Sequence, residues 1–525
     1  MEILLTIFFI ITTSILLIIL LLGSLLFLKI FIGKSIRKPE SPPVVGTVFG
    51  QFFYYNRLYD YQTGLARKHK TSRLLSPDIS EIYTTEPKNI EYILKTNFSN
   101  YAKGEVNQDI WRDLFGQGIL VVDGEKWRQQ RKLASSEFST RFLRDFSCSV
   151  FRKNAAQLVS TVREFSKTDQ FFDAQKALLM RYTLDSISKV GFGVDLDCLQ
   201  GSNAEGNEFI KAFDDSSELV YWRYVDPFWK LKRHLNIGGE AILKKKTKFI
   251  HNFVDKVIRT KREQMEKEQY YNNKEDILSR FIVESKKDPE MMTDEYLRDI
   301  ILSFIIAGKD TTANTLSWFI YVVCKNHLVQ ERIAQEIREA VVTNPQDEAS
   351  FDDFIEHITD EALEEMHYLH ATLAETLRLY PAVPVDGRCA ETDDTLPDGY
   401  KVKREMVCIT WPMQWAVCRI YGAMTLKNLN QKDGSRMGCF NLNHHSSLLL
   451  FMAGPRTCLG RDFAYRQMKI VSAALLHFFR FRLSDEASNV TYRTMFTLHI
   501  SGSLNVHAVS RVHADSRTRL LESLI

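Results

Sequence analysis

The stretch that most constrains this chain is the decapeptide Phe451-Met-Ala-Gly454-Pro-Arg456-Thr-Cys458-Leu-Gly460. Glycines let a backbone pass close to a flat ligand, and a thiolate in such a loop is a candidate axial ligand for haem iron. Arg456 is placed to pair with a haem propionate. A lone cysteine is more often a small buried hydrophobic residue. Five fixed residues at this spacing are expected by chance in about one chain in ten thousand of this length, which favours the ligand.

The decapeptide closely resembles the haem-binding loop of the cytochrome P-450 superfamily. That resemblance implies a mainly α fold with a small β-rich lobe, haem b as the cofactor, and Cys458 as the iron ligand in a loop shaped by Phe451, Gly454 and Gly460. Three further stretches resemble plant long-chain fatty-acid ω-hydroxylases of family 704: Asp123-Gly-Glu-Lys-Trp-Arg-Gln-Gln-Arg-Lys132, Tyr368-Leu-His-Ala-Thr372 and Phe463-Ala-Tyr-Arg-Gln-Met-Lys469.

The N-terminal segment carries no charged residue from Ile3 to Leu28. Such a run is long enough to cross a bilayer as one helix. Four basic residues follow it, so the positive-inside rule places the rest of the chain in the cytosol. A cleaved secretory signal is the alternative, but its apolar region is shorter and ends at a small-residue cleavage site. We predict a transmembrane anchor over 1–30 and a basic, proline-containing linker over 31–50.

Composition narrows the class of protein. Apolar residues make up 45% of the 525 positions and charged residues 25%, as in ordinary globular proteins. The net charge of +3 gives no indication of a nucleic-acid partner. The 8 cysteines show no CxxC pair, which fits a reducing compartment rather than a disulfide framework.

Trp127 and Arg131 lie four residues apart in a helix predicted over Lys126–Ser136, so they share one face. Taken alone, the pair is equally well a surface cation–π contact. The resemblance implies that a Trp-x-x-x-Arg pair at this place bonds the haem propionates. It adds Arg388 as a further candidate propionate partner.

A long apolar helix is predicted over 293–326, and it contains Ala307-Gly308-Lys-Asp310-Thr311. A glycine within a helix costs about 1 kcal/mol relative to alanine, so it usually has a reason. A threonine hydroxyl that bonds back to the carbonyl of Ala307 and bends the helix is the structural explanation. The segment matches the P-450 Ala/Gly-Gly-x-Asp/Glu-Thr motif. That match implies room for dioxygen at Gly308, its orientation by Thr311 and proton relay by Asp310.

Glu375 and Arg378 lie three apart on a helix predicted over His370–Leu379, which the following prolines end. An exposed pair would contribute only tenths of a kcal/mol, whereas the resemblance implies a buried Glu-x-x-Arg pair beneath the haem. The aromatic-rich stretch 216–229 fits plain core, a pocket roof or a membrane-dipping surface. The predicted substrate pocket comprises Leu114, Phe115, Ile119, Phe304, Ala307, Val383, Val385 and Phe496, with the valines and Phe496 on strands and 114–120 a flexible apolar loop.

One segment departs from the P-450 pattern. Residues 408–452 lack the Phe/Pro-x-Arg element whose arginine completes a triad with the Glu-x-x-Arg pair. Leu429–Gly434, back-translated and read one base earlier, can encode Phe-Lys-Pro-Glu-Arg-Trp, which is the missing element. A pair of compensating frame errors is therefore our hypothesis for this segment. His444-His445 within it has no third ligand at suitable spacing and is not predicted to bind metal.

These patterns together predict a haem-thiolate monooxygenase over 51–511, with 512–525 as a tail. The resemblance implies C–H hydroxylation of a lipophilic substrate with O₂, most specifically the ω end of long-chain fatty acids. It also implies electrons from an NADPH-dependent reductase and anchoring in the endoplasmic reticulum membrane by one span. A broken copy that never loads haem and a hydroperoxide-rearranging thiolate-haem enzyme are the alternatives.

Overall fold

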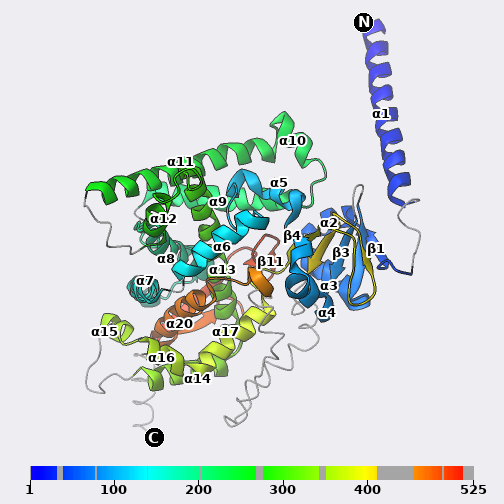
Figure 1. Cartoon of the computed structure of the whole chain (residues 1–525). Coiled ribbons are helices and arrows are strands. Elements are labelled where there is room, and N and C mark those ends of the chain that lie inside the picture. The colour runs from blue at the N-terminus through cyan, green and yellow to red at the C-terminus, as the bar shows by residue number, and fades with distance from the viewer. Residues whose placement is uncertain are drawn as a thin grey trace. The chain divides into compact units, whose positions relative to one another are not determined.

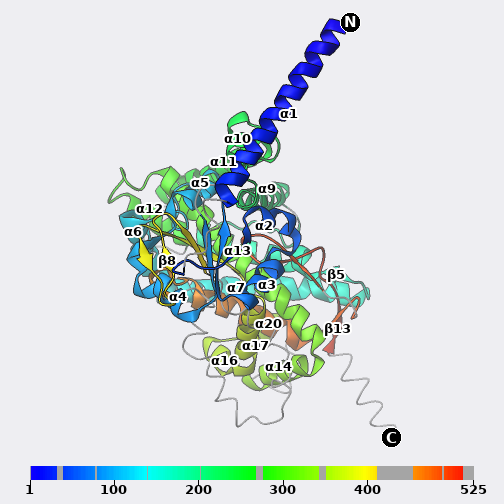
Figure 2. The same ribbon diagram turned by 90° about the vertical axis from the view of Figure 1, so that its right-hand side faces the viewer.

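The computed structural model describes residues 2–31, 39–76, 80–138, 140–201, 203–267, 276–341, 351–410, 453–486 and 490–511 (Figures 1 and 2). Contacts divide the chain into two compact units, which we describe separately. The first comprises residues up to Gly104 together with 386–411, and the second comprises the remainder.

Helix α1, Glu2–Phe31, is the predicted apolar segment. Its stretch Leu5–Lys29 has a mean hydropathy of 2.9 and none of its residues is buried against the protein. A helix of this length crosses the hydrocarbon core of a bilayer, which is about 30 Å thick. The helix therefore fits a membrane anchor.

The first unit is built on a six-stranded sheet in the order β1-β2-β3-β9-β6-β4. Its strands are β1 Val44–Thr47, β2 Thr71–Leu75, β3 Glu81–Thr84, β4 Tyr101–Ala102, β6 Asp386–Ala390 and β9 Val407–Thr410, beside a hairpin of β7 Asp394–Thr395 and β8 Lys401–Val402. Three helices accompany them: α2 Phe49–Phe53, α3 Leu58–Lys68 and α4 Pro87–Glu91. Strand β9 pairs in regular register with β3 and β6. The segment 408–452, which departs from the P-450 pattern and is called the aberrant segment below, thus begins with an ordinary strand at Cys408–Thr410. Residues 411–452 lie outside the described residues.

The second unit is helical. Its helices are α5 Gly104–Phe115, α6 Gly124–Phe138, α7 Arg141–Lys167, α8 Met180–Phe192, α9 Ala204–Trp222, α10 Trp229–Leu235, α11 Gly239–Lys267, α12 Ile277–Ser285, α13 Asp294–Lys325, α14 His327–Ala340, α15 Phe351–Glu356, α16 Asp360–Glu365, α17 His367–Leu379 and α20 Arg461–Phe478. Helix α13 runs through the middle, with α8, α11, α17 and α20 packed on it (Figure 1). The mainly α fold with a small β-rich part is confirmed.

Helix α13 begins and ends close to its predicted limits. The Thr293 hydroxyl accepts the backbone N–H of Tyr296 at 3.3 Å, and Asp294 and Glu295 stand in the first turn, where the helix dipole favours acids. Between Asp299 and Ile320 the helix is buried except at three positions. A helix buried on nearly every face needs an apolar sequence all round, which explains the long apolar run.

Two predicted strands are wrong in extent. The predicted strand 492–498 is part of a hairpin over 492–500, made of β11 Tyr492–Arg493 and β12 His499–Ile500, with Phe496 in the connecting turn. The segment with Val383 and Val385 is irregular, and strand β6 begins only at Asp386. A second small sheet orders β10 Phe479–Leu483, β13 Asn505–Ser510 and β5 Phe172–Asp173.

Candidate haem site

The cysteine loop is a tight turn that leads into α20. Gly454 has φ of 75°, a left-handed conformation that glycine adopts without steric cost. The Thr457 hydroxyl donates to the carbonyl of Gly454 at 2.6 Å and fixes the turn. Helix α20 begins at Arg461, so its positive end points back toward the cysteine.

The Cys458 thiol is exposed to solvent although protein surrounds it. Burial raises its pKa, and the backbone N–H of Gly460 and the cations Arg131 and Arg461 oppose that shift. A side chain can be reached by solvent on one side and still be shielded by neighbouring groups on the others. The thiol is therefore available as a ligand, with positive groups that favour the thiolate.

One stripe of helix α6 faces this loop. The ring of Trp127 stacks under the Arg456 guanidinium at 4.5 Å. Arg131 is close enough to Cys458 for each group to shift the pKa of the other. Phe138 packs within reach of Gly460, where an added Cβ would lie 4.0 Å from its ring. The spacing of these α6 residues matches helix periodicity, so the helix presents one continuous face to the loop.

Arg456 has a protein partner that the sequence analysis did not foresee. Its Nη2 donates to the carbonyl of Val122 at 2.9 Å and pairs with Asp123 at 2.5 Å. One nitrogen of the Arg456 guanidinium, Nη2, thus holds the cysteine loop against the segment before α6. The quoted stretch that begins at Asp123 contained this residue, but nothing in it indicated the contact.

Arg388 belongs to the first unit. It is buried in β6, where its Nη2 lies 2.8 Å from Asp386, whose other oxygen pairs with Lys103 at 2.6 Å. Burial opposes ionisation of Asp386, but the two cations lower its pKa to about 2. Within the described residues, Nη1 of Arg388 has no hydrogen-bond partner. A buried guanidinium N–H of this kind has capacity for a further acceptor.

The accessible positions in the middle of α13 are Ala307, Gly308 and Thr311. The Thr311 hydroxyl donates to the carbonyl of Ala307, which is the structural alternative weighed above. A Cβ on Gly308 would lie 2.7 Å from Cδ1 of Ile187 in α8. The missing side chain of Gly308 thus allows α13 and α8 to approach closely, a role different from the space for dioxygen that the motif implied.

Phe138 packs between helix α13 and helix α20, which follows the cysteine loop. Its ring packs edge-on against Phe304 of α13, at 5.6 Å between centroids, and against Phe463 of α20, at 6.2 Å. Phe304 lies one helical turn before the accessible positions, on the same side. The structure therefore brings the motif helix and the thiol loop to one aromatic residue that the sequence analysis missed.

Glu375 and Arg378 form a pair on α17. Nε of Arg378 donates to Oε2 of Glu375 at 2.6 Å, and Nη2 pairs with Oε1. The Arg378 side chain is 14% exposed and that of Glu375 is 7% exposed, so water screens this ion pair little. The family's third triad member, which this sequence lacks, would stand within 408–452, and residues 411–452 lie outside the described ones.

The predicted pocket residues lie in different places. Leu114 and Phe115 are buried at the end of α5, and Ile119 is buried in the following turn. Phe496 in the hairpin turn packs on Trp111 at 4.3 Å and on Tyr221 of α9 at 5.1 Å. Val383 and Val385 are half-buried. Part of the aromatic stretch 216–229 is therefore packed around the hairpin.

The loop after α5, predicted as a flexible apolar segment, makes close contacts with α13. Its Gln117 N–H donates to Asp299 of α13 at 2.8 Å. A Cβ on Gly116 would overlap the Asp299 carboxyl group, and one on Gly118 would overlap Ser303. The close approach of this loop to α13 explains both glycines, and the left-handed φ of 52° at Gly116 also favours glycine.

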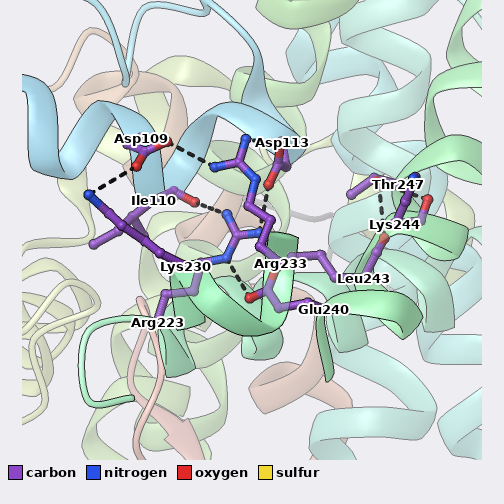
Figure 3. A network of polar contacts seen from close by, with 10 residues as sticks. All are labelled: Asp109, Ile110, Asp113, Arg223, Lys230, Arg233, Glu240, Leu243, Lys244 and Thr247. Carbon is purple, nitrogen blue, oxygen red and sulfur yellow. Dashed lines mark hydrogen bonds and ion pairs between the residues drawn. The ribbon is translucent and has the colours of Figure 1, made fainter. Parts of the chain in front are cut away.

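A network of ion pairs joins α5 to Arg223 after α9, to α10 and to the start of α11 (Figure 3). Nη1 of buried Arg223 donates to the carbonyl of Ile110 at 2.9 Å, and Nη2 pairs with Asp113 at 2.6 Å and Glu240 at 2.5 Å. Burial opposes the charge of Arg223, but the two carboxylates raise its pKa. Trp229 lies 4.8 Å from the guanidinium. The network thus fixes α5, which ends in two predicted pocket residues.

These residues fit a haem group. The donor set consists of one accessible thiol, with Arg131 and Trp127 on the helix that faces it. Among the described residues there is no cluster of three or more His, Cys, Asp or Glu that would hold a bare metal ion. Phe451 and His444-His445 lie outside the described residues.

Comparisons with known proteins agree with this site. The family model described as Cytochrome P450 matches residues 39–417 and 429–504, so its one interruption lies inside the aberrant segment. The chain is 44% identical to Cytochrome P450 704C1 of Pinus taeda over 93% of this chain and 96% of that protein. It is 39% identical to Cytochrome P450 704B1 of Arabidopsis thaliana (93% and 97%) and 34% identical to Cytochrome P450 86B1 of the same species (82% and 78%). The chain belongs to the cytochrome P450 family of monooxygenases, which carry haem iron and use O₂, a redox partner and a small-molecule substrate.

Proposed function

We propose that this protein hydroxylates the ω end of long-chain fatty acids at the cytosolic surface of the endoplasmic reticulum. The proposed catalytic domain spans 51–511, α1 is its anchor, and an NADPH-dependent flavoprotein reductase supplies the electrons. The observation that carries the haem-thiolate part is the accessible Cys458 thiol beside Arg131, on a loop faced by one stripe of α6. The substrate class rests on the resemblance to plant ω-hydroxylases and on the apolar residues near the site.

Each residue has a separate task in this proposal. Haem b, held at its iron by the Cys458 thiolate, would supply the chemistry that activates dioxygen. Trp127 and Arg131 would donate hydrogen bonds to its propionates, and Arg456 fixes the loop through Asp123. The resemblance implies the same role for Arg388 of the first unit. Gly454 and Gly460 shape the loop around the ligand.

A second set of residues holds the substrate and handles protons. Phe304 and Ala307 of α13, Leu114, Phe115 and Ile119, and Phe496, Val383 and Val385 exclude water and hold the acyl chain. Thr311 and Asp310 pass protons toward the reacting oxygen. Glu375 and Arg378 hold the core in place.

The experiment is to express the full chain in membranes and record the reduced, CO-bound absorption spectrum. Hydroxylation of a long-chain fatty acid with reductase and NADPH is then measured by mass spectrometry. A thiolate-type Soret band with ω-hydroxylated product supports the proposal, and Cys458→Ala should abolish both while α1 still inserts.

The alternatives give different results in the same assay. Absence of any haem spectrum would identify an inert copy. Conversion of a fatty-acid hydroperoxide without NADPH or reductase, with no hydroxylation, would identify a rearranging enzyme.

A further inference from the structure

Lys309 is a fully buried lysine in α13, next to the proposed proton-handling residues. Its side chain is 0% exposed, and its Nζ pairs with Asp214 of α9 and with Asp310 at 2.7 Å. The Asp310 side chain is 3% exposed, whereas that of Asp214 is 38% exposed. One ammonium group thus joins a buried carboxylate to a carboxylate on another helix that water reaches.

The charges of this group are interdependent. Burial lowers the pKa of Lys309, but Asp214 and Asp310 together raise it above its ordinary value, so the lysine stays charged. Burial also raises the pKa of Asp214, as does the charge of Asp310, while Lys309 opposes the shift. Two carboxylates share one cation, so the hold of Lys309 on either depends on the other.

Around this turn of α13 each residue has its own neighbour. Gly308 lies against α8, at Ile187. Lys309 points to α9, where it also lies 5.9 Å from the ring of Phe213. Thr311 is on the accessible face, with its hydroxyl on the carbonyl of Ala307. Asp310 is thus next in the chain to the proposed proton donor and is bound to α9 only through Lys309 among the contacts described.

The remaining titratable neighbour does not provide a second cation. His499 of β12 is buried, and burial lowers its pKa to about 3, with Lys309 and Arg493 also lowering it and Asp214 opposing. The imidazole is therefore neutral near pH 7. Arg493 itself pairs with Glu218 of α9 on the surface.

We propose that Lys309 is a positioning residue that ties the carboxylate of Asp310 to Asp214 of α9, so that proton supply to Thr311 depends on where α9 lies. Helix α9 also carries Tyr221, which packs on Phe496. A substrate that displaces this aromatic contact would shift α9 and so change the ion pair between Asp214 and Lys309. This inference rests on the proposed function, in which Asp310 and Thr311 handle protons.

The proton balance is simple. A hydronium ion that reaches Asp310 would protonate its carboxylate and leave a water molecule behind. Relay of that proton to the Thr311 hydroxyl would return Asp310 to a carboxylate as the hydroxyl gives up its own proton. Lys309 keeps its protons and neither residue ends with a changed charge. A strong hold by Lys309 keeps the Asp310 carboxylate turned toward the lysine, and a missing hold leaves that carboxylate free to turn away.

Two substitutions test the tie, and a third is a matched control. Asp214→Asn leaves the whole charge of Lys309 on Asp310, and Lys309→Met removes the cation. Asp215→Asn breaks the neighbouring ion pair of α9, with Lys246 of α11 at 2.7 Å, and leaves Lys309 alone. If the carboxylate of Asp214 acts through the lysine, the double variant loses no more than Lys309→Met.

The assay uses the full membrane-bound holoenzyme with reductase, NADPH and a long-chain fatty acid. We expect both test variants to keep the CO spectrum but to lower product per NADPH by about tenfold, less than the loss of an acid–base group itself. Peroxide should rise correspondingly, with a larger solvent deuterium effect on product formation. Since Lys309→Met at a buried site risks misfolding, Asp214→Asn at a partly exposed site carries the test alone if necessary.

Backbone hydrogen exchange of α9 in the CO-bound protein gives a readout independent of turnover. It should be faster in Lys309→Met and Asp214→Asn than in Asp215→Asn. Unchanged coupling and exchange, or an equal loss in Asp215→Asn, would overturn the inference. If the wild type shows the CO spectrum without hydroxylation, the proposed function fails, and the exchange result alone then decides whether Lys309 ties α9 to α13.

Discussion

Gly308→Ala separates the two explanations for the glycine in the middle of α13. The added Cβ would lie 2.7 Å from Cδ1 and 2.8 Å from Cγ1 of Ile187, well inside an ordinary carbon–carbon contact. Overpacking a core in this way costs about 1–3 kcal/mol, and the better helix propensity of alanine returns about 1 kcal/mol. We therefore expect a net destabilisation of about 0–2 kcal/mol by the same accounting.

The second substitution locates the clash. Ile187→Val removes Cδ1 and alone costs about 0.5–1.5 kcal/mol. Combined with Gly308→Ala it should cost less than the sum of the two single substitutions, because the nearest clashing atom, Cδ1, is gone while Cγ1 at 2.8 Å remains. The expected coupling is at most about 1 kcal/mol. Gly64→Ala in α3 is the control, since nothing lies within 4 Å of its added Cβ, and it should stabilise the protein.

The assay is urea unfolding of the holoenzyme, followed by circular dichroism, with midpoints compared at equal m-values. Additive effects of Ile187→Val and Gly308→Ala would refute the packing explanation. A stable Gly308→Ala variant that makes peroxide instead of product would favour the space for dioxygen that the motif implied.

Three further predictions concern the site. Thr311→Ala should keep the CO spectrum and substrate binding but divert NADPH to peroxide, because the hydroxyl is needed only for protons; unchanged coupling would leave it a helix-bending residue. Asp123→Asn should weaken haem retention by a few-fold, measured by haem transfer to apomyoglobin, because a charged contact of Arg456 is lost at 2.5 Å. Restoring the shifted reading across 408–452 should raise haem per protein and turnover, since a broken buried charge network typically costs about 3–5 kcal/mol. Equal loading of the two versions, or an unshifted transcript, would contradict the frame hypothesis.

The parts of the site that sequence predicted are those that depend on short stretches of chain. A threonine cap, acids in the first turn and an uninterrupted apolar run fix α13 within one residue at its end. Glu375 and Arg378 face each other because they are three apart on a helix that a proline stops. The spacing of Trp127 and Arg131 likewise places both on one face of α6, whatever the remainder of the chain does.

The parts that it missed depend on how distant segments approach one another. Lys309 and Asp214 are 95 residues apart, and a lysine in an apolar helix gives no indication of which carboxylate it will meet. Gly116 and Gly118 look like a flexible loop until the carboxyl group of Asp299 is in place beside them. Glycine in a sequence reports that a side chain is not tolerated, but only the fold says whether the reason is mobility, a left-handed turn or a neighbour too close. The same holds for Gly308, where the motif implied space for a ligand and the structure shows helix α8 in contact. These two explanations predict different effects of an added methyl group. Gly308→Ala is therefore the most informative substitution for this site.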